Sequence, residues 1–227
     1  MHQSPHPRRI VLSTLGSLGD VNPYVGIALE LKARGHRPII ATTSVYQEKI
    51  ESLGIGFHGV RPDLPSYDRP EELRKLVEKC VARRTGAAAI LKLLILPHLQ
   101  DIYQDLNDAA RGADLLVTHP LPLVGPIVAQ KTGIPWVSSV LAPMSLFSAY
   151  DPPIGPQLVA LQKLIVRNPA LSRVFIFLVK CFTAPMMWPI HRLRRELGLP
   201  RGQHPLVEGQ HSPHLVLALF SRVMMEP

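Results

Sequence analysis

Cysteine is scarce in this chain of 227 residues, which contains only Cys80 and Cys181. Two cysteines cannot build the disulfide framework that small secreted domains use. The first residues also lack the basic and apolar pattern of a signal peptide. We therefore expect reduced thiols and a cytoplasmic location.

Acidic side chains are also in the minority, with 17 Asp and Glu against 25 Lys and Arg and a formal net charge of +8. A positive surface attracts nucleic acid, anionic membranes and anionic small molecules alike. The chain has no basic run with interleaved aromatic residues, no zinc-finger spacing and no recognition-helix pattern. We expect no nucleic-acid partner, and a phosphorylated ligand or an anionic bilayer explains the charge with fewer assumptions.

Long unbroken apolar runs are missing as well. The strongly apolar stretch 174–190 is interrupted by Lys180, Pro185 and Pro189, so its apolar pieces are far shorter than the about 20 residues of a membrane span. Basic residues surround it at Arg167, Arg173, Arg192, Arg194 and Arg195. Two interpretations stay open: a helix buried in the core, or a surface helix that rests on anionic lipid.

What the chain does have is a regular alternation of strand-like and helix-like segments, which is typical of the α/β class. Strands are predicted at 9–14, 37–43, 55–60, 114–118, 135–140 and, as a last buried strand, 215–220. Helices are predicted at 23–34, 44–53, 71–84, 86–111, 122–132, 157–166 and 170–198. Parallel strands with right-handed helical crossovers give a Rossmann-like, doubly wound sheet.

The loop from Gly16 to Pro23 joins the first predicted strand to the first helix, the position where such sheets bind ligands. Glycine lets the backbone approach a ligand closely, and a helix N-terminus favours negative charge. An acidic side chain, Asp20, is unexpected in a pure phosphate cradle, so Asp20 is a candidate for chemistry. The structural alternative is a carboxylate that only stabilises the start of the helix.

This loop also carries a family resemblance. The segment 16–23, followed by 28–31 and 34–38, resembles the start of family 28 glycosyltransferases, a group that includes sterol, lipid and glycopeptide-antibiotic glucosyltransferases. Further matches follow in the right order at 53–57, 113–118, 132–135, 193–200 and 218–221. The resemblance implies the N-terminal half of a GT-B glycosyltransferase, an enzyme with two Rossmann-like domains.

The resemblance sets the expected domain limits and activity. It implies a flexible tail at 1–8, the Rossmann-like domain at 9–221, and the start of an interdomain linker at 222–227, with the donor-binding domain absent. The implied reaction is inverting transfer of a hexose from a nucleotide diphosphate sugar to a hydroxyl of a lipid, sterol or natural product. No metal and no further cofactor is expected. A non-catalytic acceptor-binding module, or one half of a split enzyme with a separate donor-binding domain, is the alternative.

The resemblance also assigns roles to residues of the first loop. Asp20 is the expected general base, which takes the proton of the acceptor hydroxyl. Gly16, Ser17 and Gly19 are expected to contact the phosphates or sugar of the donor, unless the turn merely needs glycine. Asn22 either bonds an acceptor hydroxyl or caps the helix.

Two further segments follow strands that end at the same edge of the sheet. His119 comes directly after the strand 114–118 and is expected to pair with Asp20 or the acceptor, unless it only caps the turn before Pro120. Pro143, Met144 and Ser145 follow the strand 135–140 and suit an adaptable apolar acceptor pocket, unless they form an ordinary loop.

Two other site types are disfavoured. A nicotinamide-dependent oxidoreductase would need three glycines in the first loop and an acidic residue after the second strand, and 39–43 offers none. The histidines His204, His211 and His214 do not have zinc-site spacing and no cysteine joins them.

Overall fold

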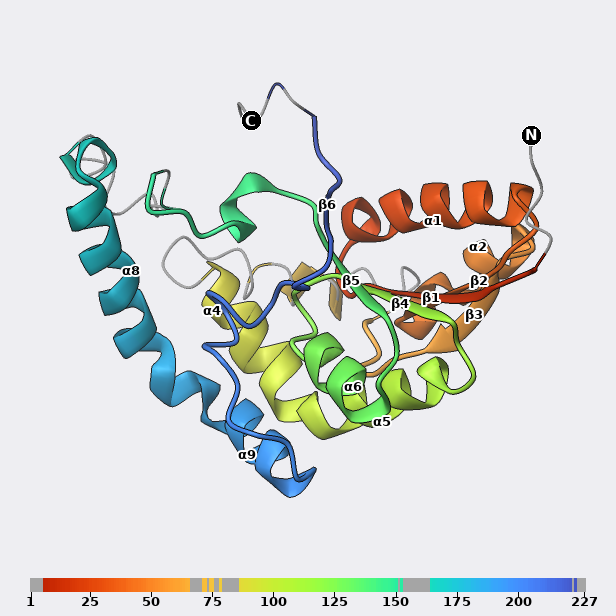
Figure 1. The fold of residues 1–227 in the computed structure, drawn as a ribbon. Helices are drawn as coiled ribbons and strands as arrows, with labels where there is room; N and C mark the ends of the chain where they lie inside the picture. The colour runs from red at the N-terminus through yellow and green to blue at the C-terminus, as the bar shows by residue number, and fades with distance from the viewer. Residues whose placement is uncertain are drawn as a thin grey trace.

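Six parallel strands form one sheet in the order β3-β2-β1-β4-β5-β6 (Figure 1). The computed structural model describes residues 6–65, 71, 72, 74, 75, 78, 86–150, 152, 164–221 and 223. The strands are β1 (Arg9–Ser13), β2 (Arg37–Thr42), β3 (Gly56–Gly59), β4 (Leu115–Thr118), β5 (Trp136–Val140) and β6 (Val216–Ala218). The predicted α/β class and Rossmann-like sheet are confirmed.

Helices cover both faces of the sheet (Figure 1). They are α1 (Leu18–Ala33), α2 (Gln47–Ser52), α4 (Gly86–Ile90), α5 (Leu99–Ala110), α6 (Gly125–Thr132), α8 (Pro169–Thr183) and α9 (Trp188–Glu196). Helices α1 and α2 pack on one face, and α5, α6 and α9 pack on the other.

Each face has its own apolar core. On the first face, Tyr24 of α1 and Ile50 of α2 are fully buried against Leu12 of β1. On the second, Leu106 of α5 and Ile190 of α9 pack in one cluster with residues of β4 and α6. Because both faces bury apolar side chains, the sheet can carry residues such as Val11 and Leu12 side by side in β1.

Most predicted elements have the right type, and the differences lie at their ends. α1 begins at Leu18, five residues before the predicted start, because Ser17 and not Pro23 sets its N-terminus. The predicted helix 86–111 is interrupted by a π turn at Leu91–Ile95 and a 3-10 turn at Leu96–His98. The predicted helix 170–198 is divided by the 3-10 turn Ala184–Met187.

The prediction of a buried last strand is wrong. β6 is an edge strand that pairs with β5 on one side, and its residues are half-buried or exposed. The predicted helix 71–84 lies mostly outside the described residues. For the predicted helix 157–166, only residues from 164 onward are described.

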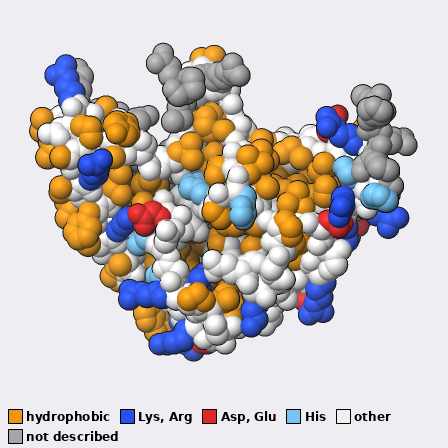
Figure 2. All heavy atoms as spheres, viewed as in Figure 1, with side chains coloured by type: hydrophobic (Ala, Val, Ile, Leu, Met, Phe, Trp, Pro, Cys, Tyr) orange, Lys and Arg blue, Asp and Glu red, His pale blue; other side chains and the backbone are white. Residues whose placement is uncertain are grey.

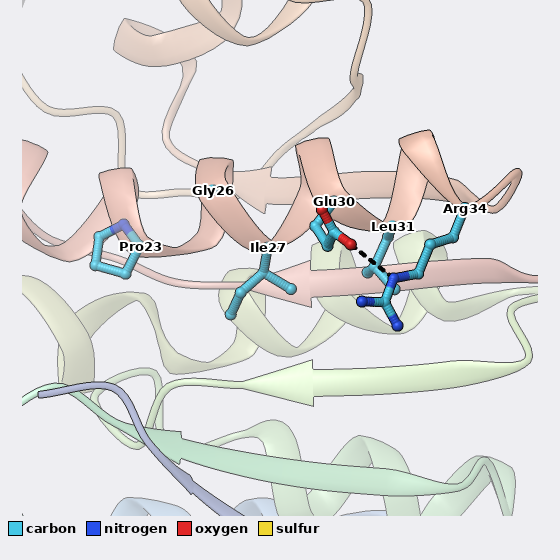
Figure 3. Close-up of a pocket in the computed structure, with 6 residues that line it drawn as sticks. All are labelled: Pro23, Gly26, Ile27, Glu30, Leu31 and Arg34. Carbon is cyan, nitrogen blue, oxygen red and sulfur yellow. Dashed lines mark hydrogen bonds and ion pairs between the residues drawn. The ribbon is translucent and has the colours of Figure 1, made fainter. Parts of the chain in front are cut away.

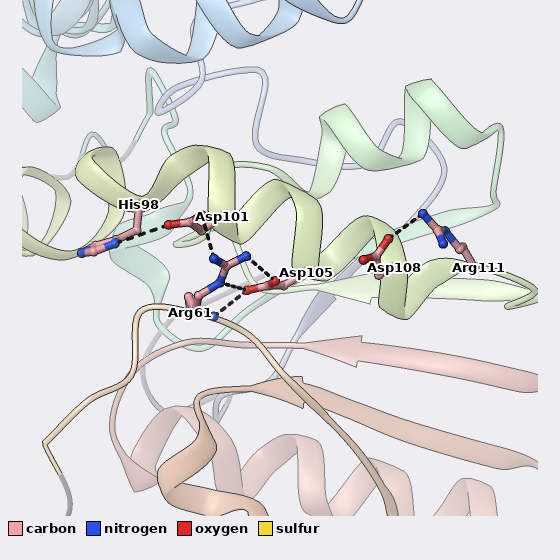
Figure 4. A network of polar contacts seen from close by, with 6 residues as sticks. All are labelled: Arg61, His98, Asp101, Asp105, Asp108 and Arg111. Atoms are coloured by element: carbon pink, nitrogen blue, oxygen red, sulfur yellow. Dashed lines mark hydrogen bonds and ion pairs between the residues drawn. The ribbon is translucent and has the colours of Figure 1, made fainter.

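An ion-pair network joins the segment after β3 to α5 (Figure 4). The Arg61 guanidinium donates to both carboxylate oxygens of Asp105, at 2.9 and 2.8 Å, and to Asp101 at 2.8 Å. Burial alone would raise the pKa of Asp105, but the hydrogen bonds from Arg61 hold it below its ordinary value. The network therefore fixes the exit of β3 on the α5 side of the sheet.

The core predicts the effect of truncating a buried side chain. L106A removes a fully buried side chain from α5 and should lower the free energy of unfolding by about 2–5 kcal/mol. L29A truncates a leucine of α1 that is 40% exposed and should change it by no more than about 0.5 kcal/mol. Urea unfolding followed by circular dichroism measures both values, and equal losses would contradict the core assignment.

Candidate functional site

The candidate site lies where the carboxyl ends of β1 and β4 meet. These strands are neighbours, and their last residues, Ser13 and Thr118, are register partners. The chain leaves β1 toward α1 on one face and leaves β4 toward α6 on the other. This is the switch point at which open α/β sheets form a crevice for ligands. The two predicted catalytic residues come after these strands, Asp20 after β1 and His119 after β4.

Asp20 closes a capping box at the start of α1. Ser17 is the N-cap, and Asp20 Oδ2 accepts hydrogen bonds from the Ser17 N–H at 2.7 Å and the Ser17 hydroxyl at 2.9 Å. Among the described residues, none donates a hydrogen bond to the other oxygen, Oδ1, and Asp20 is half-buried. The structural role foreseen for this carboxylate is therefore present, and one oxygen atom remains for a ligand.

Gly16 is required by the close approach of this carboxylate. Its φ is +141°, and a Cβ at this position would lie 2.3 Å from Asp20 Oδ2. The Gly16 carbonyl accepts a hydrogen bond of 3.0 Å from the Tyr46 hydroxyl. The first loop thus needs glycine for its own geometry.

The remaining groups of this loop are largely engaged within it. The Gly19 N–H donates to the Ser17 hydroxyl at 3.2 Å, and the Ser17 N–H is bound to Asp20. A donor phosphate would have to compete with these bonds, and its contact with Gly16, Ser17 and Gly19 stays a prediction. Asn22 does not cap the helix, because Ser17 does; instead Asn22 accepts a hydrogen bond of 2.7 Å from Lys49.

His119 directly follows β4, within electrostatic range of the Asp20 carboxylate. Its backbone N–H donates to the Ser13 carbonyl at 2.9 Å, which continues the β1–β4 ladder. Its Nδ1 atom is buried, and no described group bonds to it. Burial lowers the pKa of His119 below its ordinary value, while the Asp20 carboxylate acts in the opposite direction. The two side chains are therefore within electrostatic range of each other, although within the described part of the chain no hydrogen bond joins them.

The turn after His119 is strained. The Leu123 N–H donates to the Pro120 carbonyl at 3.0 Å, and Leu123 has a φ of +57°, a left-handed conformation that is costly for a leucine. Gly125 follows at the start of α6, where a Cβ would lie 2.5 Å from the Thr118 hydroxyl. The packing around this turn therefore fixes the direction in which the chain continues from β4 through His119.

A buried hydroxyl chain lies beneath these residues, and the sequence analysis did not find it. The Tyr24 hydroxyl and Ser139 Oγ are 2.6 Å apart, and Ser139 Oγ donates to the Thr118 carbonyl at 3.2 Å. Burial raises the pKa of Tyr24 above its ordinary value. The available signal was the spacing: Tyr24 stands one helical turn after Asp20 on the same face of α1.

The predicted acceptor segment follows β5 at the same edge. Pro143–Ser145 is a 3-10 turn, and the Ser145 carbonyl accepts from Gln210 Nε2 at 3.0 Å and lies 3.2 Å from His211 Nε2. The side chain of Met144 is outside the described part. The acceptor role of these residues stays a prediction.

Neither a metal cluster nor a deep cavity is found at Asp20 in what the structure describes. No group of three His, Cys, Asp or Glu within 6–65, 86–150 or 164–221 could hold a metal ion. His204 Nε2 lies 3.2 Å from the Thr183 hydroxyl, so His204 and His211 have other partners. A shallow groove of about 500 Å³ runs along α1 from Pro23 to Arg34, away from Asp20 (Figure 3).

A protein-family model matches the first part of the chain. Residues 10–99 match the model of the glycosyltransferase family 28 N-terminal domain. This part of the chain is therefore similar to the N-terminal domain of family 28 glycosyltransferases. Asp20 lies inside the matched region, and His119 lies beyond it.

Sequence relatives extend the likeness to about two thirds of this chain. It is 33% identical over 149 residues to a sterol 3-beta-glucosyltransferase of Glomerella lagenarium, a match that covers 64% of this chain and 10% of the relative. It is 30% identical over 142 residues to a sterol 3-beta-glucosyltransferase of Komagataella phaffii, covering 63% and 11%. The chain thus spans about a tenth of the length of these relatives.

Solved structures share the fold of this chain. The glycotransferase of kitacinnamycin matches with a TM-score of 0.55 and 17% identity, over 98% of this chain and 48% of that one. The Streptomyces sp. SF2575 glycosyltransferase SsfS6, complexed with thymidine diphosphate, matches with a TM-score of 0.51 and 18% identity, over 92% and 48%. The predicted GT-B relationship of the fold is confirmed. The predicted domain limits at 8, 221 and 227 stay predictions.

The capping box predicts strong coupling between Gly16 and Asp20. G16A should lower the free energy of unfolding by more than about 1 kcal/mol, because the new Cβ meets the carboxylate at a positive φ. G16A/D20A should cost less than the sum of the single changes, since D20A removes the clashing atoms. G26A in α1 is the control and should not destabilise, as nothing lies within 4 Å of its new Cβ. Strict additivity in chemical denaturation would contradict the geometry.

The site also predicts the titration of His119. The pKa of its imidazole, followed by NMR, should lie below about 6.5, and D20N should lower it further because the carboxylate favours the charged form. Since the folded protein prefers neutral His119, stability should be fully present above about pH 6.5 and decrease as the pH falls below it. The variant H119Q should weaken this acid destabilisation. A pKa that does not fall in D20N would contradict the electrostatic interaction between the two groups.

Proposed function

We propose that this chain is the acceptor-side domain of an inverting glycosyltransferase. The reaction would move a hexose from a nucleotide diphosphate sugar to a hydroxyl of a lipid, sterol or other small molecule. The observation that carries the proposal is the position of Asp20 inside the family 28 region, at the switch point between β1 and β4, with His119 as its neighbour. The sterol glucosyltransferase relatives support a sterol-like acceptor.

The proposed chemistry needs one base and no covalent intermediate. The acceptor oxygen attacks the anomeric carbon as the bond to the nucleoside diphosphate breaks, and the hydroxyl proton passes to Asp20 Oδ1. The bonds from Ser17 hold Oδ2 and so orient the carboxylate before the acceptor binds. His119 would accept or donate a hydrogen bond at the acceptor, which supplies its buried Nδ1 or its other ring nitrogen with a partner.

The donor is assigned by analogy. SsfS6 was solved with thymidine diphosphate, which supports a nucleotide diphosphate as the leaving group. This chain covers 48% of each of these two solved structures, which supports a separate donor-binding domain as its partner. We also propose a cytoplasmic location, peripheral contact with an anionic membrane, and catalysis without a metal ion. No observed contact favours the oxidoreductase alternative.

The general-base role can be tested in a chimera. This chain, fused to the donor-binding half of the Komagataella phaffii relative, should transfer glucose from UDP-glucose to a sterol. D20N should lower kcat by about 10²–10⁴-fold with little change in KM, because the base acts in the transition state. D108N is the matched control, since Asp108 lies on α5 and pairs with Arg111 at its surface.

The outcomes separate the candidate functions. Full activity of the D20N chimera would leave Asp20 as a capping residue alone. Sterol binding by an inactive but folded chimera, measured by tryptophan fluorescence, would favour the non-catalytic acceptor-binding module.

A further inference from the structure

Helix α8 presents apolar side chains to solvent. Asn168 caps it by accepting from the N–H groups of Ala170 and Leu171, so the helix has a defined start. Of its fifteen residues, only Ser172 is buried. Val174 is 54% exposed, Leu178 57% and Phe182 90%. The interpretation of 174–190 as a buried core helix is therefore wrong for its first half.

These residues share one face. Leu171, Val174, Leu178 and Phe182 follow one another at intervals of three and four residues, which places them along one side of a helix. Phe177 flanks this face and is 61% exposed. A pocket of about 640 Å³ lies among the α8 residues from Phe175 to Thr183. A contiguous apolar face of this kind is unusual on a surface that contacts only water.

The continuation of α8 is anchored in the core. After the turn Ala184–Met187, the side chains of Met187, Ile190 and Leu193 are buried in the cluster on the α5 side. α8 extends from this anchor along one side of the molecule, opposite α1 (Figure 1). Figure 2 shows hydrophobic side chains and interspersed basic ones on this side.

This anchoring excludes a membrane-spanning arrangement for the whole segment. By length and composition, 169–196 could cross a bilayer, since an 18-residue window within it has a mean hydropathy of 1.5. The exposed part is the fifteen residues of α8, which span about 22 Å at 1.5 Å per residue, less than the about 30 Å of a hydrocarbon core. The remainder is bound to the folded domain, so α8 can lie on a membrane but not cross it.

A basic pocket begins where α8 ends. It has a volume of about 460 Å³, and its lining includes Trp188, His191, Arg194, Arg195 and Arg201 but no acidic residue among those described. The acidic residue of α9, Glu196, is paired with Arg192 at 2.7 Å. Arg194 is buried and bonds to the neutral oxygens of Gln130 and Pro200.

Among the described residues, no acidic side chain pairs with the arginines of this pocket. Burial, together with the nearby guanidinium groups of Arg201 and Arg194, lowers the pKa of His191. A concave site with three guanidinium groups favours a phosphate group, since guanidinium pairs with phosphate through charge-assisted hydrogen bonds. Trp188 is 56% exposed beside it, the type of side chain that is enriched at membrane interfaces.

We propose that α8 and the basic pocket at α9 dock this protein on an anionic phospholipid bilayer, with the apolar face of α8 among the acyl chains and a phosphate headgroup in the pocket. The charge of the pocket selects this occupant over a second copy of the chain, because a copy of +8 net charge would bring like charges together. An apolar helix face beside a cationic site is the combination that binds at bilayer surfaces. This inference rests on the membrane contact proposed above and assigns it a site, but its test is separate from glycosyl transfer, since vesicle binding needs no turnover.

Vesicle co-sedimentation of the full chain tests the proposal. The protein should bind phosphatidylcholine vesicles containing about 30% phosphatidylglycerol at least about tenfold more tightly than pure phosphatidylcholine vesicles, and less tightly in about 0.5 M salt. F177E/F182E should lower binding at least about tenfold, because two charges enter the apolar contact. R195Q/R201Q should lower binding to the anionic vesicles by about 30-fold, at about fivefold for each cation.

Matched controls lie on the other side of the molecule. L29E/L53E places two acidic residues at exposed leucines of 40% and 37% on the α1–α2 side, and R34Q/R37Q removes two cations there. Both should retain wild-type binding. Thermal unfolding checks that all four variants are folded.

Four results would overturn the proposal. Equal binding to both vesicle types, or none, would remove the role of the headgroup. An equal loss in the controls would reduce the effect to net charge. A dimer in light scattering that F177E/F182E disperses, without vesicle binding, would assign the face to a second copy. Stabilisation by inorganic phosphate without vesicle binding would leave a soluble anion as the ligand.

Discussion

The pairing of β1 with β4 is the constraint on which the site depends. These two strands are far apart in the sequence, and their last residues are register partners. Because the helices that follow them go to opposite faces, no helix closes the edge between them. Asp20 and His119 reach the same region for this reason alone. Neither residue would be near the other if the strand order followed the chain.

The sheet and the first loop could be predicted because their signals are local. β-branched runs, glycines and helical periodicity specify each element within about ten residues, and parallel crossovers leave few arrangements. The start of α1 was misplaced because Pro23 and Ser17 both favour a helix start, and only the geometry of Asp20 with Ser17 decides between them. The Tyr24–Ser139–Thr118 chain could not be predicted, since its members come from α1, β5 and β4 and meet only after the sheet forms.

The segment 169–196 shows the limit of composition. Apolar residues are frequent in both halves, yet α8 is exposed and α9 is anchored in the core. Which half is buried depends on where the turn Ala184–Met187 falls relative to α5, and that contact lies about ninety residues away in the chain. Apolar periodicity identifies a face but does not identify what covers it.

The loop 204–211 connects α8 with the edge of the sheet. At one end, Glu208 forms an ion pair with Lys180 of α8, and His204 lies beside the Thr183 hydroxyl. At the other end, Gln210 and His211 hold the Ser145 carbonyl after β5. A tilt of α8 against the domain must therefore stretch the same eight residues that position this turn. Helix α8 and the turn after β5 are thus linked through one loop, by polar side chains that lie outside the apolar core.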